Sequence, residues 1–204
     1  MHLCVYVKNG QSVSLTSTVN GLFGSKIVTE HGLVLNDQLD DFGLRDSLNG
    51  AGPNKRPLSS AVPLFLMKDN EVILIAGGTG GIRISTGVAQ AVFNIIQRGM
   101  DVQEAVRYPR IHHDLVPNVL SYESNLDKTI VDYLESCGHE MLKDAPQRTQ
   151  SAIEMIVVND GKPKCGVDPR KGGCGIVTGG VVKNRIWVEH NGWVNMGRLV
   201  PTSL

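Results

Sequence analysis

A cluster of glycines between a strand-like and a helix-like segment constrains the fold of this chain most strongly: residues 77–81 read Gly-Gly-Thr-Gly-Gly. Residues 71–76 have strand character, whereas Val88, Val92 and Ile95 recur at helical spacing. Glycines at such a junction predict a tight turn that exposes backbone N–H groups near a helix start. These groups can bind a phosphate or stabilise an oxyanion. Nucleotide binding is the weaker interpretation, because neither the P-loop spacing nor G-x-G-x-x-G is matched.

The rest of the chain alternates between strand and helix patterns. Turn residues separate predicted strands at residues 2–7, 12–19, 32–35, 61–67, 71–76, 151–158 and 163–167. Predicted helices follow the glycine cluster up to Gly99 and cover residues 102–107, capped by Asp101, and 125–137. Residues 42–57 are predicted to be a surface loop. Strands, paired helices and strands in this order predict an α+β layered sandwich.

Charge and apolar content exclude several classes of protein. The 20 Lys and Arg balance 20 Asp and Glu, which argues against a nucleic-acid-binding surface built on overall basicity. No apolar run approaches the roughly 18 residues that a membrane span needs. The opening MHLCVYVKNG lacks the basic start and the long apolar stretch of a signal peptide. We therefore expect a globular chain with no export address of its own.

Cysteine and histidine spacing does not indicate a metal site. The four cysteines lack C-x-x-C spacing, and the six histidines form neither H-x-x-x-H nor H-E-x-x-H. Adjacent His112 and His113 would point in different directions on a strand or on a helix, so we expect them to be structural. The sequence thus predicts no bound metal.

Three further polar clusters can bind a ligand, and each has an ordinary structural alternative. Residues 16–20 place alternate hydroxyls on one strand face with an amide at the end, although threonine is also common in strands. Residues 36–41 hold three carboxylates and two amides, which suits an ammonium group, although acidic turns are more often just solvated. Arg56 with Ser59 and Ser60 forms either a seat for a carboxylate or a plain turn.

Taken together and in this order, the four clusters resemble the small catalytic chain of the γ-glutamyltransferase family, also called glutathione hydrolases, within the N-terminal-nucleophile hydrolases. The resemblance runs from about His2 to Gly173, through HLCVYVKNGQSVSLTSTVN, FGSKIV, GLVLNDQLDDF, GPNKRPLSS, GGTGGIRIST, DVQEAVRYPRIHH and DPRKGG. It implies a proenzyme cut into two chains that fold together into a four-layer αββα sandwich, of which this chain would form half. It also implies a γ-glutamyl amide substrate such as glutathione, and no cofactor.

The family pattern assigns roles to individual residues of this chain. Thr18 would support the nucleophile, and the backbone N–H groups of Gly80 and Gly81 would form the oxyanion hole. The α-amino and α-carboxyl end of the γ-glutamyl group would be bound by Asn20, Gln38, Asp41, Ser59 and Ser60, with the two serines on the carboxylate. In such an enzyme an amino-terminal threonine attacks the γ-carbonyl with its own α-amine as base, and water or an amino acid resolves the acyl-enzyme.

The first position departs from this pattern. The family's small chain opens with the nucleophilic threonine, a small residue and a histidine that aligns with His2, so Met1 falls on the small residue. Thr16 and Thr18 cannot take over, because each is predicted inside a strand with no free amine beside it. We expect the chain as written to be inactive alone, and to need a large chain that supplies an arginine and the rest of the sandwich.

The resemblance covers residues 1–175, whereas residues 176–204 match no family segment and carry both tryptophans. Family members usually work outside the cytoplasm or at its membrane with an address in the large chain, so localisation stays open. Two hypotheses stand beside a light-chain part of the enzyme. One is a non-catalytic light-chain paralogue that binds γ-glutamyl compounds or a large chain. The other is an unrelated nucleotide-binding domain that uses the turn at residues 77–81.

Overall fold

The computed structural model describes residues 1–9, 11–143 and 150–177, so most of the predicted tail lies outside the described residues. Among the described residues, every helix is too short or too polar to cross a membrane. The predicted mixed α+β character is confirmed. In chain order the elements are β1 (His2–Tyr6), β2 (Ser12–Thr16), η1 (Gln38–Asp41), β3 (Leu64–Lys68), β4 (Glu71–Thr79), α1 (Arg83–Ile96), α2 (Val102–Arg107), β5 (Ile111–His113), β6 (Leu120–Tyr122), α3 (Lys128–Ser136), β7 (Met141–Lys143), β8 (Ala152–Asn159) and β9 (Lys162–Val167).

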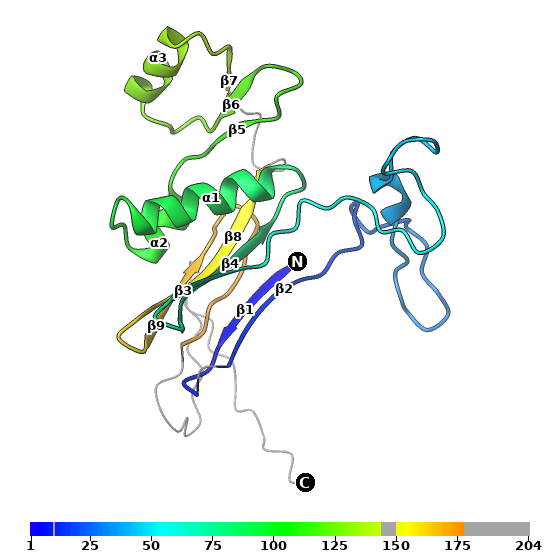
Figure 1. The fold of residues 1–204 in the computed structure, drawn as a ribbon, viewed down its shortest axis with the longest axis horizontal. Helices are drawn as coiled ribbons and strands as arrows, with labels where there is room; N and C mark the ends of the chain where they lie inside the picture. Colours follow the sequence, from blue (N-terminus) through cyan, green and yellow to red (C-terminus); the bar gives the residue numbers. More distant parts are fainter. Residues whose placement is uncertain (10, 144–149, 178–204) are drawn as a thin grey trace.

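A four-stranded antiparallel sheet in the order β3-β4-β8-β9 forms the centre of the fold (Figure 1). Side chains alternate between its two faces, so Leu74 and Met155 pack against α1 and α2, whereas Ile75 and Ile156 face the other way. All four are buried. Because both faces are covered, β4 and β8 consist of nearly continuous apolar residues.

The starts of α2 and α3 follow from local capping signals. Asp101 accepts a hydrogen bond from the backbone N–H of Gln103 at 3.0 Å, which confirms it as the cap of α2. The predicted third helix begins at Lys128 rather than at residue 125, because Asp127 caps it through the N–H of Thr129 at 2.8 Å. The apolar face of α1 packs on the central sheet and buries Ile84, Val88 and Ala91.

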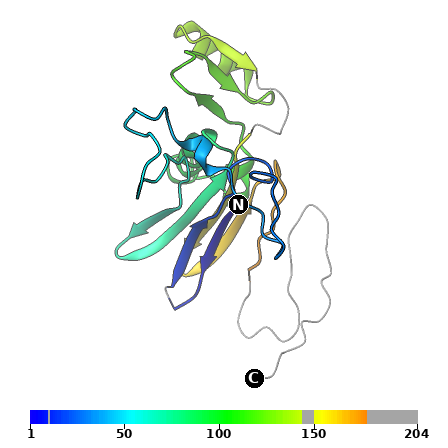
Figure 2. The same ribbon diagram turned by 90° about the vertical axis from the view of Figure 1, so that its right-hand side faces the viewer.

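The β1–β2 hairpin covers the face of the central sheet opposite to the helices (Figures 1 and 2). Its inward side is partly polar, and the Ser14 hydroxyl donates to the carbonyl of Ala76 on β4 at 3.1 Å. The predicted apolar side of each strand is present but points outward. Leu3, Val13 and Leu15 are therefore 46–47% exposed. The outward face of the hairpin is thus apolar and is not covered by another part of the described chain.

A small sheet of β5, β6 and β7 lies with α3 beyond α1 (Figure 1). Its strands were not predicted, because each has three residues and is too short to show alternation. The strand predicted at residues 32–35 is wrong. That segment forms a single bridge, between Val28 and Val34, and Leu33 and Leu35 stay exposed.

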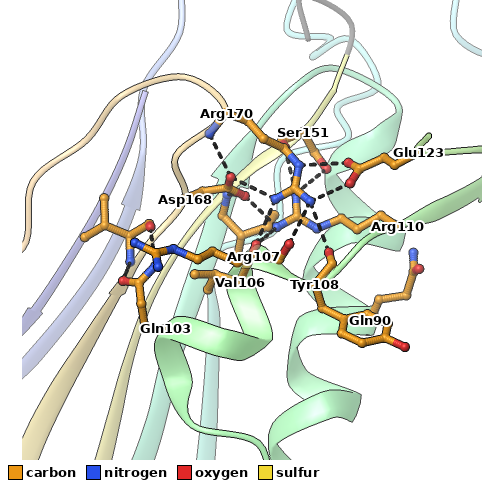
Figure 3. Close-up of polar contacts among 12 residues, drawn as sticks. Gln90, Gln103, Val106, Arg107, Tyr108, Arg110, Glu123, Ser151, Asp168 and Arg170 are labelled. Carbon is orange, nitrogen blue, oxygen red and sulfur yellow. Dashed lines mark hydrogen bonds and ion pairs between the residues drawn. The ribbon is translucent and has the colours of Figure 1, made fainter. Parts of the chain in front are cut away.

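Four buried charged residues tie these parts together (Figure 3). Asp168, directly after β9, is fully buried and pairs with Arg110 at 2.5 Å and with Arg170 at 2.9 Å. Arg170 also binds Glu123, after β6, at 2.6 Å. The cluster extends to the backbone, because Asp168 accepts from the N–H of Ile153 on β8 at 3.0 Å and Arg110 donates to the carbonyl of Val106 on α2.

We predict that Asp168→Asn lowers the free energy of unfolding by about 3–5 kcal/mol, because it leaves two buried guanidinium groups without their shared carboxylate. Urea denaturation monitored by circular dichroism measures the change. Asp132→Asn is the matched control, since the Lys128–Asp132 pair is exposed to solvent and such pairs contribute little to stability. Equal effects of the two substitutions would contradict a structural role for the buried cluster.

Candidate active site

The glycine turn at the end of β4 takes the predicted shape. Gly80 and Gly81 have φ values of +130° and +60°, and their carbonyls accept from the N–H groups of Arg83 and Ile84 as α1 begins. Both φ values are unfavourable for residues with a Cβ. Unlike α2 and α3, α1 has no side chain capping it among the described residues. Its start therefore keeps N–H groups that can face an anion.

The amino end of β1 lies at the same end of the layers as this turn. His2 pairs with Thr16 across the hairpin, and its Nδ1 lies 2.9 Å from the Thr16 hydroxyl. The His2 ring rests on Gly77 of β4, where a Cβ would overlap it. Burial lowers the pKa of His2, so the ring is neutral near pH 7. Gly77 thus lets the first strand lie directly over the start of the glycine turn.

Thr18 and Asn20 follow β2 and meet the segment around Asp37. The Thr18 hydroxyl accepts from the N–H of Asn20 at 2.8 Å, and Asn20 has a φ of +69°. The Asn20 amide donates to the carbonyl of Asp37 at 3.3 Å, and the Asp37 carboxylate accepts from the N–H of Gly21 at 2.8 Å. These contacts place residues 18–21 beside the start of η1.

Gln38 and Asp41 lie on η1, where the Gln38 side-chain amide donates to the Asp41 carboxylate. Asn49 holds this turn from the other side. Its amide donates to the carbonyl of Asp41 at 2.8 Å, and its side-chain oxygen accepts from the N–H of Leu58 at 3.2 Å. The loop from residue 42 to residue 57 is thereby folded back, so that the segment before Ser59 lies close to Asp41.

The structure joins some of the predicted site residues and leaves others apart. Hydrogen bonds link Thr18 and Asn20 through Asp37 to the segment of Gln38 and Asp41, as described above. The Ser59 hydroxyl instead accepts from the N–H of Ala61 at 3.1 Å, and Ser60 is half-buried. Residues 20–55, blue to cyan in Figure 1, extend away from the central sheet that carries Gly80 and Gly81. A single pocket formed by all these residues therefore stays a prediction.

Sequence analysis assigned no individual role to three residues of this part of the fold: Asp37, which it named only as one of the carboxylates of residues 36–41, Asn49 and Glu154. Asp37 and Asn49 act through backbone contacts, which an acidic or polar turn composition does not reveal. Glu154 on β8 was missed although a carboxylate inside the apolar run Ala-Ile-Glu-Met-Ile is a visible signal. Burial raises the pKa of Glu154 to about 7, and the nearby charge of Asp168 adds to this effect.

The paired histidines differ in their surroundings. His112 is buried and lies between the Thr86 hydroxyl of α1 at 2.8 Å and the Asp114 carboxylate at 2.7 Å. His113 is half-buried and accepts from the N–H of Leu115. Within the described part of the chain, no three His, Cys, Asp or Glu side chains gather as metal ligands would. His112 thus connects the first turns of α1 to β5.

The layered fold is that of N-terminal-nucleophile hydrolases. A cephalosporin acylase from Bacillus halodurans matches it in fold alone, with a TM-score of 0.71 at 24% identity over 78% of this chain and 30% of that chain. Gamma-glutamyltranspeptidase from Pseudomonas nitroreducens gives a TM-score of 0.79 at 31% identity, over 87% of this chain and 99% of that chain. The fold therefore defines the class that the sequence resemblance implies.

The family is narrower than this class. The family model for gamma-glutamyltranspeptidase matches residues 1–178. The glutathione hydrolase proenzyme of Escherichia coli (strain K12) is 39% identical over 182 residues, 83% of this chain and 31% of that protein. Glutathione hydrolase 3 of Arabidopsis thaliana is 42% identical, over 79% of this chain and 28% of that protein. The chain belongs to the gamma-glutamyltranspeptidase family, and spans less than a third of the length of the curated relatives it matches first.

We predict different costs for the two alanine substitutions in the glycine turn. The Cβ of Gly81→Ala would lie in open space, so only the left-handed backbone is unfavourable. We expect the free energy of unfolding to fall by about 1 kcal/mol. Gly80→Ala also places a Cβ 2.5 Å from the Cα of Ser151, and we expect about 3 kcal/mol. The shift of the urea midpoint measures both. Equal costs would show that the close approach to Ser151 does not constrain the turn.

Proposed function

We propose that this chain provides the light-chain part of a glutathione hydrolase or γ-glutamyltransferase. The complete enzyme would cleave γ-glutamyl amides such as glutathione through a γ-glutamyl-enzyme, and pass the group to water or to an amino acid. The observation that carries the proposal is the hydrogen-bonded segment that collects Thr18, Asn20, Gln38 and Asp41 from separate parts of the sequence.

The chemistry of these side chains suits the α-amino acid end of a γ-glutamyl group. The Asp41 carboxylate and the side-chain oxygens of Gln38 and Asn20 can accept from an ammonium group. Ser59 and Ser60 bring two hydroxyl donors for the α-carboxylate. In this proposal, movement of residues 20–60 against the glycine turn closes the site around the substrate.

The glycine turn would stabilise the charge that develops during acyl transfer. Attack on the γ-carbonyl places a negative charge on its oxygen, and backbone N–H groups at a helix start stabilise such an oxyanion. Gly80 and Gly81 stand at the start of α1, which lacks a side-chain cap within the described chain. Their N–H groups are therefore the donors that we assign to the oxyanion hole.

The nucleophile of this family is a threonine whose own α-amine acts as the base. Thr16 lies inside β2 and Thr18 follows it, so neither has an α-amine free for this role. We propose that catalysis requires a threonine placed before the small residue at the position of Met1. The 204-residue chain alone is then expected to cleave no γ-glutamyl amide.

The outward face of the β1–β2 hairpin supports a partner chain. Leu3, Val13 and Leu15 are nearly half exposed there, and Leu22 and Leu44 of the extended segment are 94% and 86% exposed. Exposed large apolar side chains in such numbers are typical of an interface. We propose that a family large chain covers it and completes a four-layer αββα sandwich, with no metal or other cofactor.

The decisive measurement is the hydrolysis of a chromogenic γ-glutamyl anilide. The 204-residue chain is compared with a version that has Thr-Ala in place of Met1, each with and without a family large chain. We expect turnover only for the Thr-Ala version with the large chain. Folded complexes that stay inactive would contradict the proposal, and γ-glutamyl binding without turnover would favour the non-catalytic light-chain alternative.

Substitution of two neighbouring carboxylates, in the Thr-Ala version with the large chain, tests the assignment of the substrate site. Asp41 is half-buried beside Gln38, whereas Asp40 is exposed. We expect Asp41→Asn to lower kcat/KM about 10- to 100-fold, because a hydrogen bond between charged groups contributes about 1.5–3 kcal/mol. Asp40→Asn should change it less than about twofold. A similar loss for both variants would contradict the role of Asp41 in ammonium binding.

A further inference from the structure

Glu154 is a buried carboxylic acid between two layers of the fold. It lies on β8 opposite Gly77 of β4 and Val167 of β9, and its neighbours Met155 and Ile153 face the helices. Its own side chain therefore faces the β1–β2 hairpin. The Cys4 thiol of β1 donates to the backbone carbonyl of Glu154 at 3.5 Å. The carboxyl thus lies beneath the first strand, close to the level of His2, which rests on Gly77.

The carboxyl forms no ion pair within the described residues. Its Oε2 is buried without a hydrogen bond, and none of the salt bridges formed by the described residues includes Glu154. The nearest guanidinium groups are already engaged, since Arg110 pairs with Asp168 and Arg170 with both Asp168 and Glu123. An ionised carboxylate in such a place is costly, whereas a protonated one is tolerated.

Burial favours the neutral form of most titratable groups that face Glu154. On β1, burial lowers the pKa of His2 and raises that of the Cys4 thiol to about 12. On β9, burial also raises the pKa of Cys165. Gly77 of β4 and Ser14 of β2 contribute no charge. The helices α1 and α2 lie on the other face of the sheet.

The charged groups near Glu154 have opposite effects. Asp168 raises the pKa of Glu154, whereas the amino group of Met1 and the Arg110 guanidinium lower it. Burial lowers the pKa of Lys171, in the turn after β9, and the charges of Asp168 and Glu154 oppose this shift. Burial of the carboxyl outweighs these charges and raises the pKa of Glu154 to about 7.

We propose that Glu154 is a proton-controlled positioning residue for the first strand: with its proton it lets the β1–β2 hairpin pack on the central sheet, and without it the hairpin is loosened. The position of residues 1 and 2 then depends on pH. The significance of this for catalysis rests on the proposed function, because that end of β1 would lie next to the nucleophile. The change in hairpin packing itself does not depend on any activity.

The direction of the effect follows from proton linkage. The pKa of Glu154 in the folded chain, about 7, lies above its ordinary value of 4.5. The packed hairpin therefore binds more protons than the open form between these values. The stabilisation is fully present below pH 4.5 and is lost as the pH rises through 7.

Hydrogen exchange of the full 204-residue chain tests the proposal, with rates corrected for the pH dependence of intrinsic exchange. We expect protection of residues 2–6 to fall about tenfold or more between pH 5 and pH 8, while protection of α1 stays constant. In Glu154→Gln, which lacks this carboxyl, protection of residues 2–6 should no longer fall between pH 5 and pH 8, because the lowered pKa of His2 acts in the opposite direction and stabilises the packed hairpin as the pH rises. Glu104→Gln, an exposed position on α2, is the matched control and should behave like the unmodified chain.

Carboxyl NMR of the unmodified chain gives a second test that needs no variant. One glutamate resonance should titrate near neutral pH. If all glutamates titrate below pH 5, or if β1 protection in Glu154→Gln falls with pH as in the unmodified chain, the proposal is overturned. Neither result would bear on the γ-glutamyl assay, so failure of this inference is distinguishable from failure of the proposed function.

Discussion

The charge of Asp168 is the constraint on which the other parts of the fold depend. A fully buried carboxylate needs partners, and it finds them in Arg110 and Arg170. Arg110 lies directly before β5 and Arg170 lies in the turn after β9, so satisfying one charge orders segments that are distant in sequence. Arg110 also donates to the carbonyl of Ser151, the residue against which Gly80 packs. The ion cluster thereby supports the shape of the glycine turn.

Sequence patterns predict the central part of this fold. They fail for segments whose structure depends on contacts with distant parts of the chain. The long strands β4 and β8 and the helix α1 were predicted, because their apolar periodicity and their glycine and aspartate boundaries are local signals. The strands of the small sheet were missed, since three residues such as Ile111–His113 show no period. The pattern at residues 32–35 resembled a strand, but backbone pairing needs a neighbour, and the segment has one bridge.

In the candidate site, too, local contacts could be predicted from the sequence, whereas contacts between distant segments could not. Contacts over two or three residues, such as Thr18 with Asn20 and Gln38 with Asp41, join residues that one motif already groups. The bridge through Asp37 and the burial of Glu154 arise from segments distant in sequence, so composition alone does not reveal them. Family membership over residues 1–178 adds what local chemistry lacks, namely an order for these clusters along one chain.

The order of strands in the central sheet also determines when the first residues of the chain can be placed. The β1–β2 hairpin packs on β4 and on β8, and β8 starts at Ala152. On the ribosome, residues 2–16 therefore emerge well before the β8 part of their docking surface exists. Within residues 1–177 the hairpin is made before β8 and gains its contacts with β8 only afterwards, so the side chains that pack there stay uncovered until β8 is made.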